Sequence, residues 1–100
     1  MQGYVMAMVR FDDEASYERY TRAVAPTITA FGGRVAAYGR PVETLEGDPG
    51  SVTYGVVLEF DSVETAHDWW RSPEYAAVRP LRTDHGSSTI LLLERIPVDL

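Results

Sequence analysis

The sequence contains no cysteine and no lysine, and each absence excludes a group of functions. Without cysteine there are no disulfides, no thiolate nucleophile and no cysteine ligands for a metal, a composition typical of reducing compartments. Without lysine there is no Schiff-base chemistry and no phosphate-loop lysine. Two large groups of enzymes are therefore excluded.

Long apolar runs and an excess of positive charge are missing as well. No run reaches the length of a membrane span, and the first residues lack the order of a secretory signal, so we expect a cytoplasmic protein with no membrane partner. Nine basic residues, all arginines, stand against fifteen acidic residues, which gives a net charge of -6. Because nucleic acids are bound largely through clustered basic side chains, we expect no nucleic-acid partner.

Motifs that hold metals or cofactors are also missing. The two histidines, His67 and His85, form no His-Glu-x-x-His pattern, which disfavours a catalytic zinc or iron site. The acidic segment 43–48 lacks the spacing of a calcium loop. No glycine-rich nucleotide loop follows a predicted strand. We expect no metal and no cofactor.

What the sequence does contain is the pattern of one α+β domain over residues 1–100, a length that suits a single core. Extended apolar segments predict four strands, at residues 4–11, 34–43, 52–60 and 89–94. After the first strand, apolar residues at spacings of three and four predict a helix that begins at Asp12 or Asp13 and ends at Gly32-Gly33. Pro26 lies inside this helix and predicts a kink or a break.

A second helix is predicted after Asp61, which would cap it. Its inner stripe is formed by Val63, Ala66 and Trp70. A shorter helix is predicted from Pro73 to about Arg82, with Ser72 as its cap. The resulting order βαββαβ is that of the split βαβ, or ferredoxin-like, fold, with a four-stranded antiparallel sheet whose first and third strands lie side by side at the centre.

The strands are apolar on both faces, and this pattern predicts a homodimer. Every position in the segments 4–9 and 90–93 is apolar, so both faces of these strands are apolar. Two helices cover one face of a four-stranded sheet, and the other face would be an apolar patch larger than monomers tolerate. A second copy that packs sheet against sheet would cover it.

Several motifs, spread over almost the whole chain, resemble the family known as domain of unknown function 1330. The most specific are Leu45-Glu46-Gly47 and Ser72-Pro73-Glu74-Tyr75. The others are Gly3-Tyr4, Tyr17 with Tyr20, Gly32-Gly33-Arg34, Glu43-Thr44, Glu59-Phe60, Trp70 and Arg82. The resemblance implies a dimeric α/β barrel, as in cofactor-free antibiotic-biosynthesis monooxygenases and muconolactone isomerases, and it implies no agreed activity. The chain departs from the family pattern at Glu94-Arg95, where a Glu-Gly pair is usual.

Two charged residues interrupt apolar strands, Arg10 and Glu59, each directly before a phenylalanine. If the two central strands ran parallel, these side chains would share a face and meet, and a buried charge needs a partner. The alternatives for Glu59 are a structural ion pair with Arg10 and an acid that faces a substrate.

A second group of candidates lies around the short helix. Tyr75, Arg79 and Arg82 fall on one helical face, preceded by Trp69 and Trp70 and followed by His85. Such a group could bind a planar anionic or phenolic metabolite, with Arg82 holding an oxyanion and His85 moving a proton. The alternative is that the rings belong to the core and the arginines are solvated or paired.

The sequence therefore leaves two main functions open. The first is a cofactor-independent enzyme of isomerase, cyclase or monooxygenase type that acts on a small aromatic or apolar metabolite. Its catalytic candidates are Arg82, His85 and Glu59, and its substrate-binding candidates are Trp70, Tyr75, Tyr38 and Arg40. The second is a non-catalytic module that binds a small ligand or serves as an accessory protein, since a nucleophile and a metal are missing.

Overall fold

The computed structural model describes residues 2–98, so residue 1 and residues 99–100 of the expected domain lie outside the described residues. Its strands are β1 Gly3–Phe11, β2 Arg34–Gly39, β3 Tyr54–Phe60 and β4 Gly86–Glu94. Its helices are α1 Glu14–Ala30, α2 Val63–Arg71, α3 Pro73–Val78 and α4 Pro80–Thr83. The sheet order is β2-β3-β1-β4, and all neighbouring strands are antiparallel. The predicted α+β class and ferredoxin-like order are confirmed.

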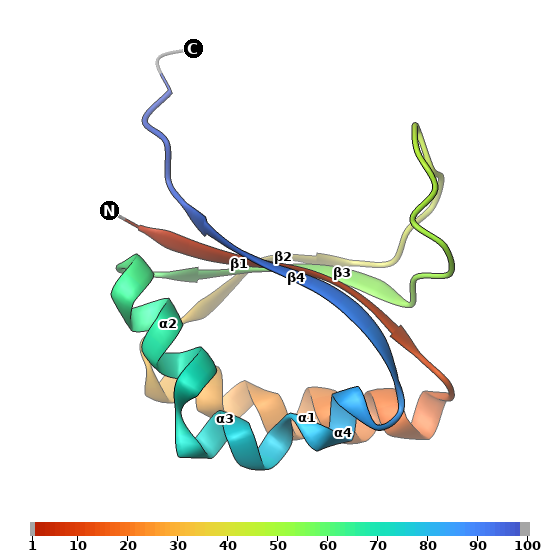
Figure 1. Cartoon of the computed structure of the whole chain (residues 1–100), viewed down its shortest axis with the longest axis horizontal. Helices are drawn as coiled ribbons and strands as arrows, with labels where there is room; N and C mark the ends of the chain where they lie inside the picture. Colours follow the sequence, from red (N-terminus) through yellow and green to blue (C-terminus); the bar gives the residue numbers. More distant parts are fainter. Residues whose placement is uncertain (1, 99–100) are drawn as a thin grey trace.

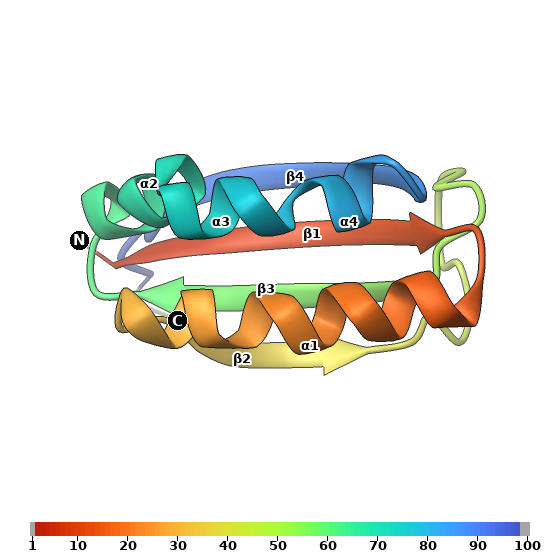
Figure 2. The same cartoon turned by 90° about the horizontal axis from the view of Figure 1, so that it is seen from below.

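The helices lie on one face of the sheet, and the opposite face carries none (Figure 1). Seen from the helix side, α1 runs along β2 and β3, whereas α2, α3 and α4 lie over β1 and β4 (Figure 2). Along β1, buried residues that face the helices alternate with more exposed ones on the other side, where Met6 and Met8 are 41% and 44% exposed. The prediction of strands that are apolar on both faces is confirmed. Among residues 2–98, no helix is both long and apolar enough to span a membrane.

Helix α1 is capped by Asp13, whose carboxylate accepts a hydrogen bond from the Ser16 amide at 2.8 Å. The predicted break near Pro26 is wrong, because α1 continues through it to Ala30. Pro26 lies on the exposed face of the helix, as does Arg22 one turn earlier, so the carbonyl that loses its amide partner can be hydrated. Gly32, with a φ of 72°, ends the helix as predicted.

In the second half of the chain, two expectations about α2 are wrong by one residue. The cap is Ser62 and not Asp61, since the Ser62 hydroxyl accepts the Thr65 amide at 3.0 Å. The buried ring is Trp69, at 2% exposure, whereas Trp70 is half-buried. Trp70 turns toward α3, where its ring centroid lies 5.3 Å from that of Tyr75.

The short helix predicted from Pro73 to about Arg82 is divided in two. Ser72 caps α3 as predicted, with its hydroxyl accepting the Tyr75 amide at 3.1 Å. Pro80 then interrupts the hydrogen-bonding pattern, because it has no amide hydrogen to donate. Helix α4 starts at Pro80, and Arg82 is the buried residue of this second helix.

The predicted contact between Arg10 and Glu59 is wrong, because β1 and β3 run antiparallel. Glu59 lies opposite Tyr4, near the start of β1, whereas Arg10 lies near its end. Arg10 instead pairs with Asp12 at 2.8 Å, and Glu59 pairs with Arg34 at 2.8 Å. Both charges thus have partners that are partly exposed to solvent.

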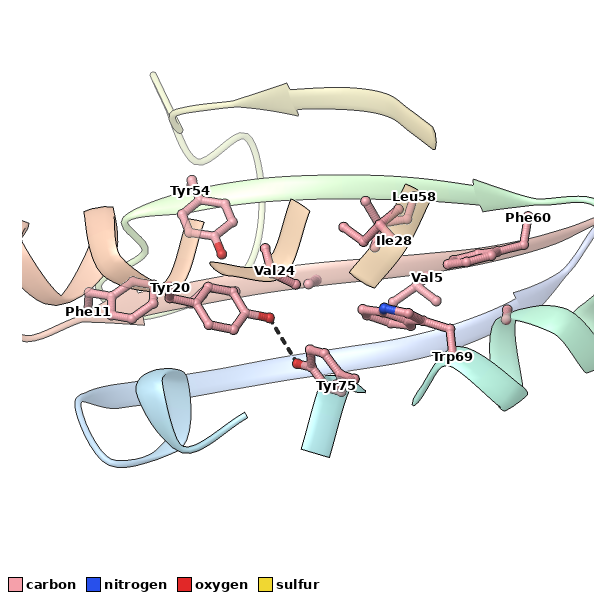
Figure 3. Packing of buried hydrophobic residues seen from close by; sticks show 13 residues of the cluster. Val5, Phe11, Tyr20, Val24, Ile28, Tyr54, Leu58, Phe60, Trp69 and Tyr75 are labelled. Atoms are coloured by element: carbon pink, nitrogen blue, oxygen red, sulfur yellow. Dashed lines mark hydrogen bonds between the residues drawn. The ribbon is translucent and has the colours of Figure 1, made fainter. Parts of the chain in front are cut away.

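The core between the helices and the sheet is rich in aromatic side chains (Figure 3). The Trp69 ring centroid lies 4.4 Å from that of Tyr75 and 5.5 Å from that of Phe60. The Trp69 indole N–H donates to the Thr27 hydroxyl of α1 at 3.0 Å. The polar edge of a buried ring is thereby satisfied, and the bond joins α2 to α1 across the core.

We expect Thr27→Val to destabilise the fold. Valine has nearly the same shape as threonine, but it lacks the hydroxyl that accepts the hydrogen bond from the buried Trp69 indole. A buried donor without a partner should lower the free energy of unfolding by about 1–3 kcal/mol. Chemical denaturation followed by tryptophan fluorescence measures this change. The matched control is Thr29→Val, at an exposed position of α1 where the hydroxyl bonds only to the Ala25 carbonyl. Equal losses from the two changes would contradict the role given to the indole bond.

Candidate functional site

A pocket of about 290 Å³ lies between the helices and the inner face of the sheet. Its walls come from α1, α2 and α3 on one side and from all four strands on the other, and most lining side chains are aliphatic or aromatic. The exposed lining residues belong to α1 and β2, so the pocket opens between these two elements; they are Ala25, Thr29, Arg34, Val35 and Tyr38. A pocket of this kind suits a small, mainly apolar molecule.

The polar groups of the pocket are largely tyrosine hydroxyls. Tyr20, Tyr54 and Tyr75 are 6%, 5% and 0% exposed, and Tyr38 lies at the open edge. Tyr20 and Tyr75 share a hydrogen bond of 2.9 Å between their hydroxyl oxygens, marked in Figure 3. The Tyr38 hydroxyl bonds to that of Tyr17 at the surface. The sequence brings these rings together because α1 packs its inner stripe over β3 and α3.

Arg82 stands directly behind this group of phenols. Its side chain is buried, at 6% exposure for the residue. Its Nε donates to the Tyr75 hydroxyl at 3.3 Å and its Nη1 donates to the Ser88 hydroxyl at 3.0 Å. Its guanidinium carbon lies 5.9 Å from the Tyr20 ring centroid and 5.8 Å from that of Trp70. Within residues 2–98, no carboxylate forms an ion pair with Arg82.

Burial sets the ionisation of these groups. It raises the pKa of both Tyr20 and Tyr54 far above the ordinary phenol value, with neighbouring phenols adding to the effect. Burial and then the hydrogen bond with Tyr17 raise the pKa of Tyr38 to about 12. For Arg82, burial lowers the pKa, but the Tyr75 and Tyr20 oxygens outweigh it, so the pKa is raised overall. At neutral pH, Tyr20, Tyr38 and Tyr54 are therefore neutral phenols, and Arg82 is a cation close to Tyr20 and Tyr54.

The structure brings together four of the predicted site residues and separates the other three. Trp70, Tyr75 and Tyr38 line the pocket, and Arg82 contacts it through Tyr75. Arg79, from the same predicted face, lies over the Trp70 ring at 4.6 Å.

The separated residues are His85, Glu59 and Arg40. His85 follows α4 outside the pocket wall, where its carbonyl accepts the Asp12 amide at 2.8 Å. Glu59 points to the uncovered face of the sheet and binds Arg34 and Gln2. Arg40 is exposed in the segment 40–53, after β2. Their proposed roles stay predictions, to be tested separately from the pocket.

Sequence reasoning named Trp69 with the candidate group around the short helix, but it did not place Tyr20 or Tyr54 in the site. A signal for Tyr54 exists, since it shares the alternation of Leu58 and Phe60 and so faces the helices. Tyr20 is on the predicted inner stripe of α1, but its contact with Tyr75 depends on how two distant helices pack. Among the described residues, no group of three or more metal-ligating side chains is close enough to hold a metal ion.

We expect the chain to lose stability steadily above about pH 10. The pKa of each buried phenol is higher in the folded state than in the unfolded state, so its contribution is complete below the unfolded pKa and falls as pH rises toward the folded pKa. Tyr20 and Tyr54 should each lower the free energy of unfolding by about 1.4 kcal/mol per pH unit in this range. Denaturation at several pH values, with tyrosinate absorbance, measures the slope. Tyr54→Phe should lower the slope by its own share of about 1.4 kcal/mol per pH unit, whereas Tyr4→Phe, on the uncovered face, should not; a flat profile would contradict the burial argument.

Solved structures share the fold of this chain at low sequence identity. A protein of unknown function from Rhodopseudomonas palustris has a TM-score of 0.80 at 19% identity, covering 97% of this chain and 84% of that one. A dimeric ferredoxin-like protein of unknown function from Thermobifida fusca has 0.64 at 15%, covering 93% and 90%. A hydroxynitrile lyase from Passiflora edulis has 0.73 at 11%, covering 96% and 97%. Two further similar structures are likewise described as dimeric.

These likenesses establish the fold alone, since all identities are low. A comparison with curated proteins finds no match. The family model described as a domain of unknown function (DUF1330) matches residues 2–96, almost the whole length. The resemblance noted in the sequence is therefore confirmed, and the chain belongs to the DUF1330 family.

Proposed function

We propose that the chain forms a homodimer through the uncovered face of its sheet. The centre of that face is apolar, with Met6 paired to Leu91 on β4 and to Val57 on β3. The segments 40–53 and 95–98 rise from the sheet on this same side, at opposite ends of it (Figure 1). Both carry highly exposed apolar side chains: Val42 99%, Leu45 89%, Ile96 77% and Val98 64%.

A second copy accounts for all of these exposed groups at once. It would cover the face and pack between the two raised segments, and similar structures are described as dimeric. A closed two-fold contact also leaves the helices, and the pocket beneath them, accessible to solvent.

The change Met6→Glu should dissociate this dimer, because it places a charge at the centre of an apolar contact. Light scattering at micromolar concentration measures the mass, and we expect a dimer for the parent chain and a monomer for the variant. The control Ala77→Glu adds the same charge on the exposed side of α3 and should leave the dimer intact. A parent chain that is monomeric would disprove the assembly.

We further propose that each copy binds a small aromatic or apolar molecule in the pocket and acts on it as a cofactor-independent enzyme. The observation that supports this is a 290 Å³ apolar pocket that contains several phenol hydroxyls, one of which, that of Tyr75, is hydrogen-bonded to a buried arginine. In such a site, the phenol hydroxyls hold and polarise an oxygen of the substrate, and Arg82 strengthens this through Tyr75. An isomerisation or a cyclisation needs no more than such a group and a proton acceptor.

A non-catalytic binding module is the second candidate, and one observation favours it. Three phenols of the pocket, Tyr20, Tyr38 and Tyr54, have raised pKa values, so none of these three is a good base at neutral pH. A protein that only holds a ligand requires no base.

Ligand screening by thermal shift, followed by analysis of each ligand for chemical change, separates the two candidates. Binding to the folded state raises the melting temperature in either case. For an enzyme we expect a ligand to be converted, and Tyr75→Phe to lower kcat by about 10-fold or more by removing the polarised hydroxyl. His85→Ala tests the remaining expectation from the sequence, and since His85 is outside the pocket wall we expect little effect. Recovery of every ligand unchanged would favour the binding module.

A further inference from the structure

The Tyr54 side chain is largely buried, and its hydroxyl makes no hydrogen bond within residues 2–98. The residue is 5% exposed and lines the pocket. Its ring is held by Phe11, Tyr17 and Tyr38, with centroids 6.3, 5.3 and 5.2 Å away. In Figure 3 its oxygen points from β3 into the space beside Val24. Among residues 2–98 no group makes a hydrogen bond with this hydroxyl, so a rigidly held donor is free to bind a ligand.

The pair of Tyr20 and Tyr75 supplies a second unused donor. Their two hydroxyls carry two hydrogens, and the bond between them uses one. The Tyr75 oxygen also accepts a hydrogen bond from Arg82. Because the bond from Arg82 polarises the Tyr75 hydroxyl and makes it the better donor, we assign Tyr75 as the donor to Tyr20. The Tyr20 hydrogen is then left without an acceptor in the described part of the chain. Both phenols line the same pocket as Tyr54.

Acceptors are scarce on the pocket wall. Among residues 2–98, no aspartate or glutamate lines it, although the whole chain has a net charge of -6. The Trp69 N–H is already satisfied by Thr27, and Thr29 donates to a carbonyl of its own helix. Arg34, the one charged residue of the wall, lies at the opening and pairs with Glu59 outside it. The pocket thus has unused donors, a cation behind them and no anion.

From this excess of donors we propose that the ligand is a small aromatic or apolar molecule with a carboxylate or enolate oxygen, bound by the Tyr54 and Tyr20 hydroxyls. This inference rests on the pocket binding proposed above and adds the chemical class of the ligand. The cation favours an oxygen that is negatively charged, because Arg82 has hydroxyl partners only. Tyr54 and Tyr20 contact the ligand, and Arg82 is a positioning residue that acts through Tyr75.

Three probes that share two fused aromatic rings and differ only in their polar group test this class. They are 2-naphthoate, 2-naphthylmethanol and 2-naphthylmethylammonium, titrated calorimetrically into the full chain at neutral pH. We expect 2-naphthoate to bind most tightly and the alcohol about 10-fold more weakly. The ammonium compound should not bind measurably, because its positive charge would lose its hydration near the Arg82 cation with no carboxylate among the lining residues to pair with it.

Variants then locate the contact. Tyr54→Phe should weaken the binding of 2-naphthoate by about 10-fold and the binding of the alcohol by less, because a hydrogen bond to a charged group is stronger than one to a neutral group. Tyr20→Phe provides a second variant with the same expected direction, and Arg82→Gln should reduce the preference for 2-naphthoate over the alcohol. Tyr17→Phe is the matched control, since it keeps the ring against Tyr54 and removes a hydroxyl outside the pocket wall.

The outcomes separate this inference from the proposed function. Equal affinity for the three probes, or binding of 2-naphthoate that neither Tyr54→Phe nor Tyr20→Phe weakens, would overturn the oxygen contact and leave pocket binding standing. If none of the probes binds, pocket binding fails and the inference fails with it. Circular dichroism and denaturation confirm that each variant is folded.

Discussion

The sheet has more apolar surface than its own helices can cover, and much of the molecule follows from this imbalance. On the inner face, Val5 and Leu58 are 5% exposed beneath α1 and α2. On the outer face, Met6, Met8 and Leu91 stay 41%, 44% and 51% exposed. Burial of apolar surface is the main favourable contribution to folding and association, so the same strand pattern that builds the core also creates a surface for a second copy.

Features that depend on short spacings along the chain could be predicted from the sequence. The alternation in β1 predicted its two faces, Ser72-Pro73 predicted the start of α3, and Gly32 predicted the end of α1. The two errors about α2 concern choices between neighbouring residues. Asp61 and Ser62 are both competent caps, and the choice depends on where β3 ends and on how α2 must turn to bury Trp69, which are properties of the packed structure.

In the candidate site, too, contacts between residues close in sequence could be predicted, whereas contacts that depend on the packed structure could not. Tyr75 and Arg82 are close in sequence, and their contact could be anticipated from helical spacing. His85 is three residues beyond Arg82, yet it leaves the site because α4 ends at Thr83 and β4 begins at Gly86, so the chain reverses between them. The Tyr20 contact joins residues 55 positions apart, and it depends on two helices that meet only after the sheet has formed.

Arg82 is costly for stability alone, and this bears on what the site does. A buried cation loses its hydration. Hydrogen bonds from it to neutral hydroxyls compensate for less of this lost free energy than an ion pair with a carboxylate would. An apolar side chain of similar volume would fill the same space at lower cost. In apolar surroundings, however, a charge is screened less than in water, so its field reaches through Tyr75 to the hydroxyls that face the pocket. The apolar wall that fits a ligand thus also makes one cation effective, which is the arrangement expected where negative charge arrives with a ligand or develops on it.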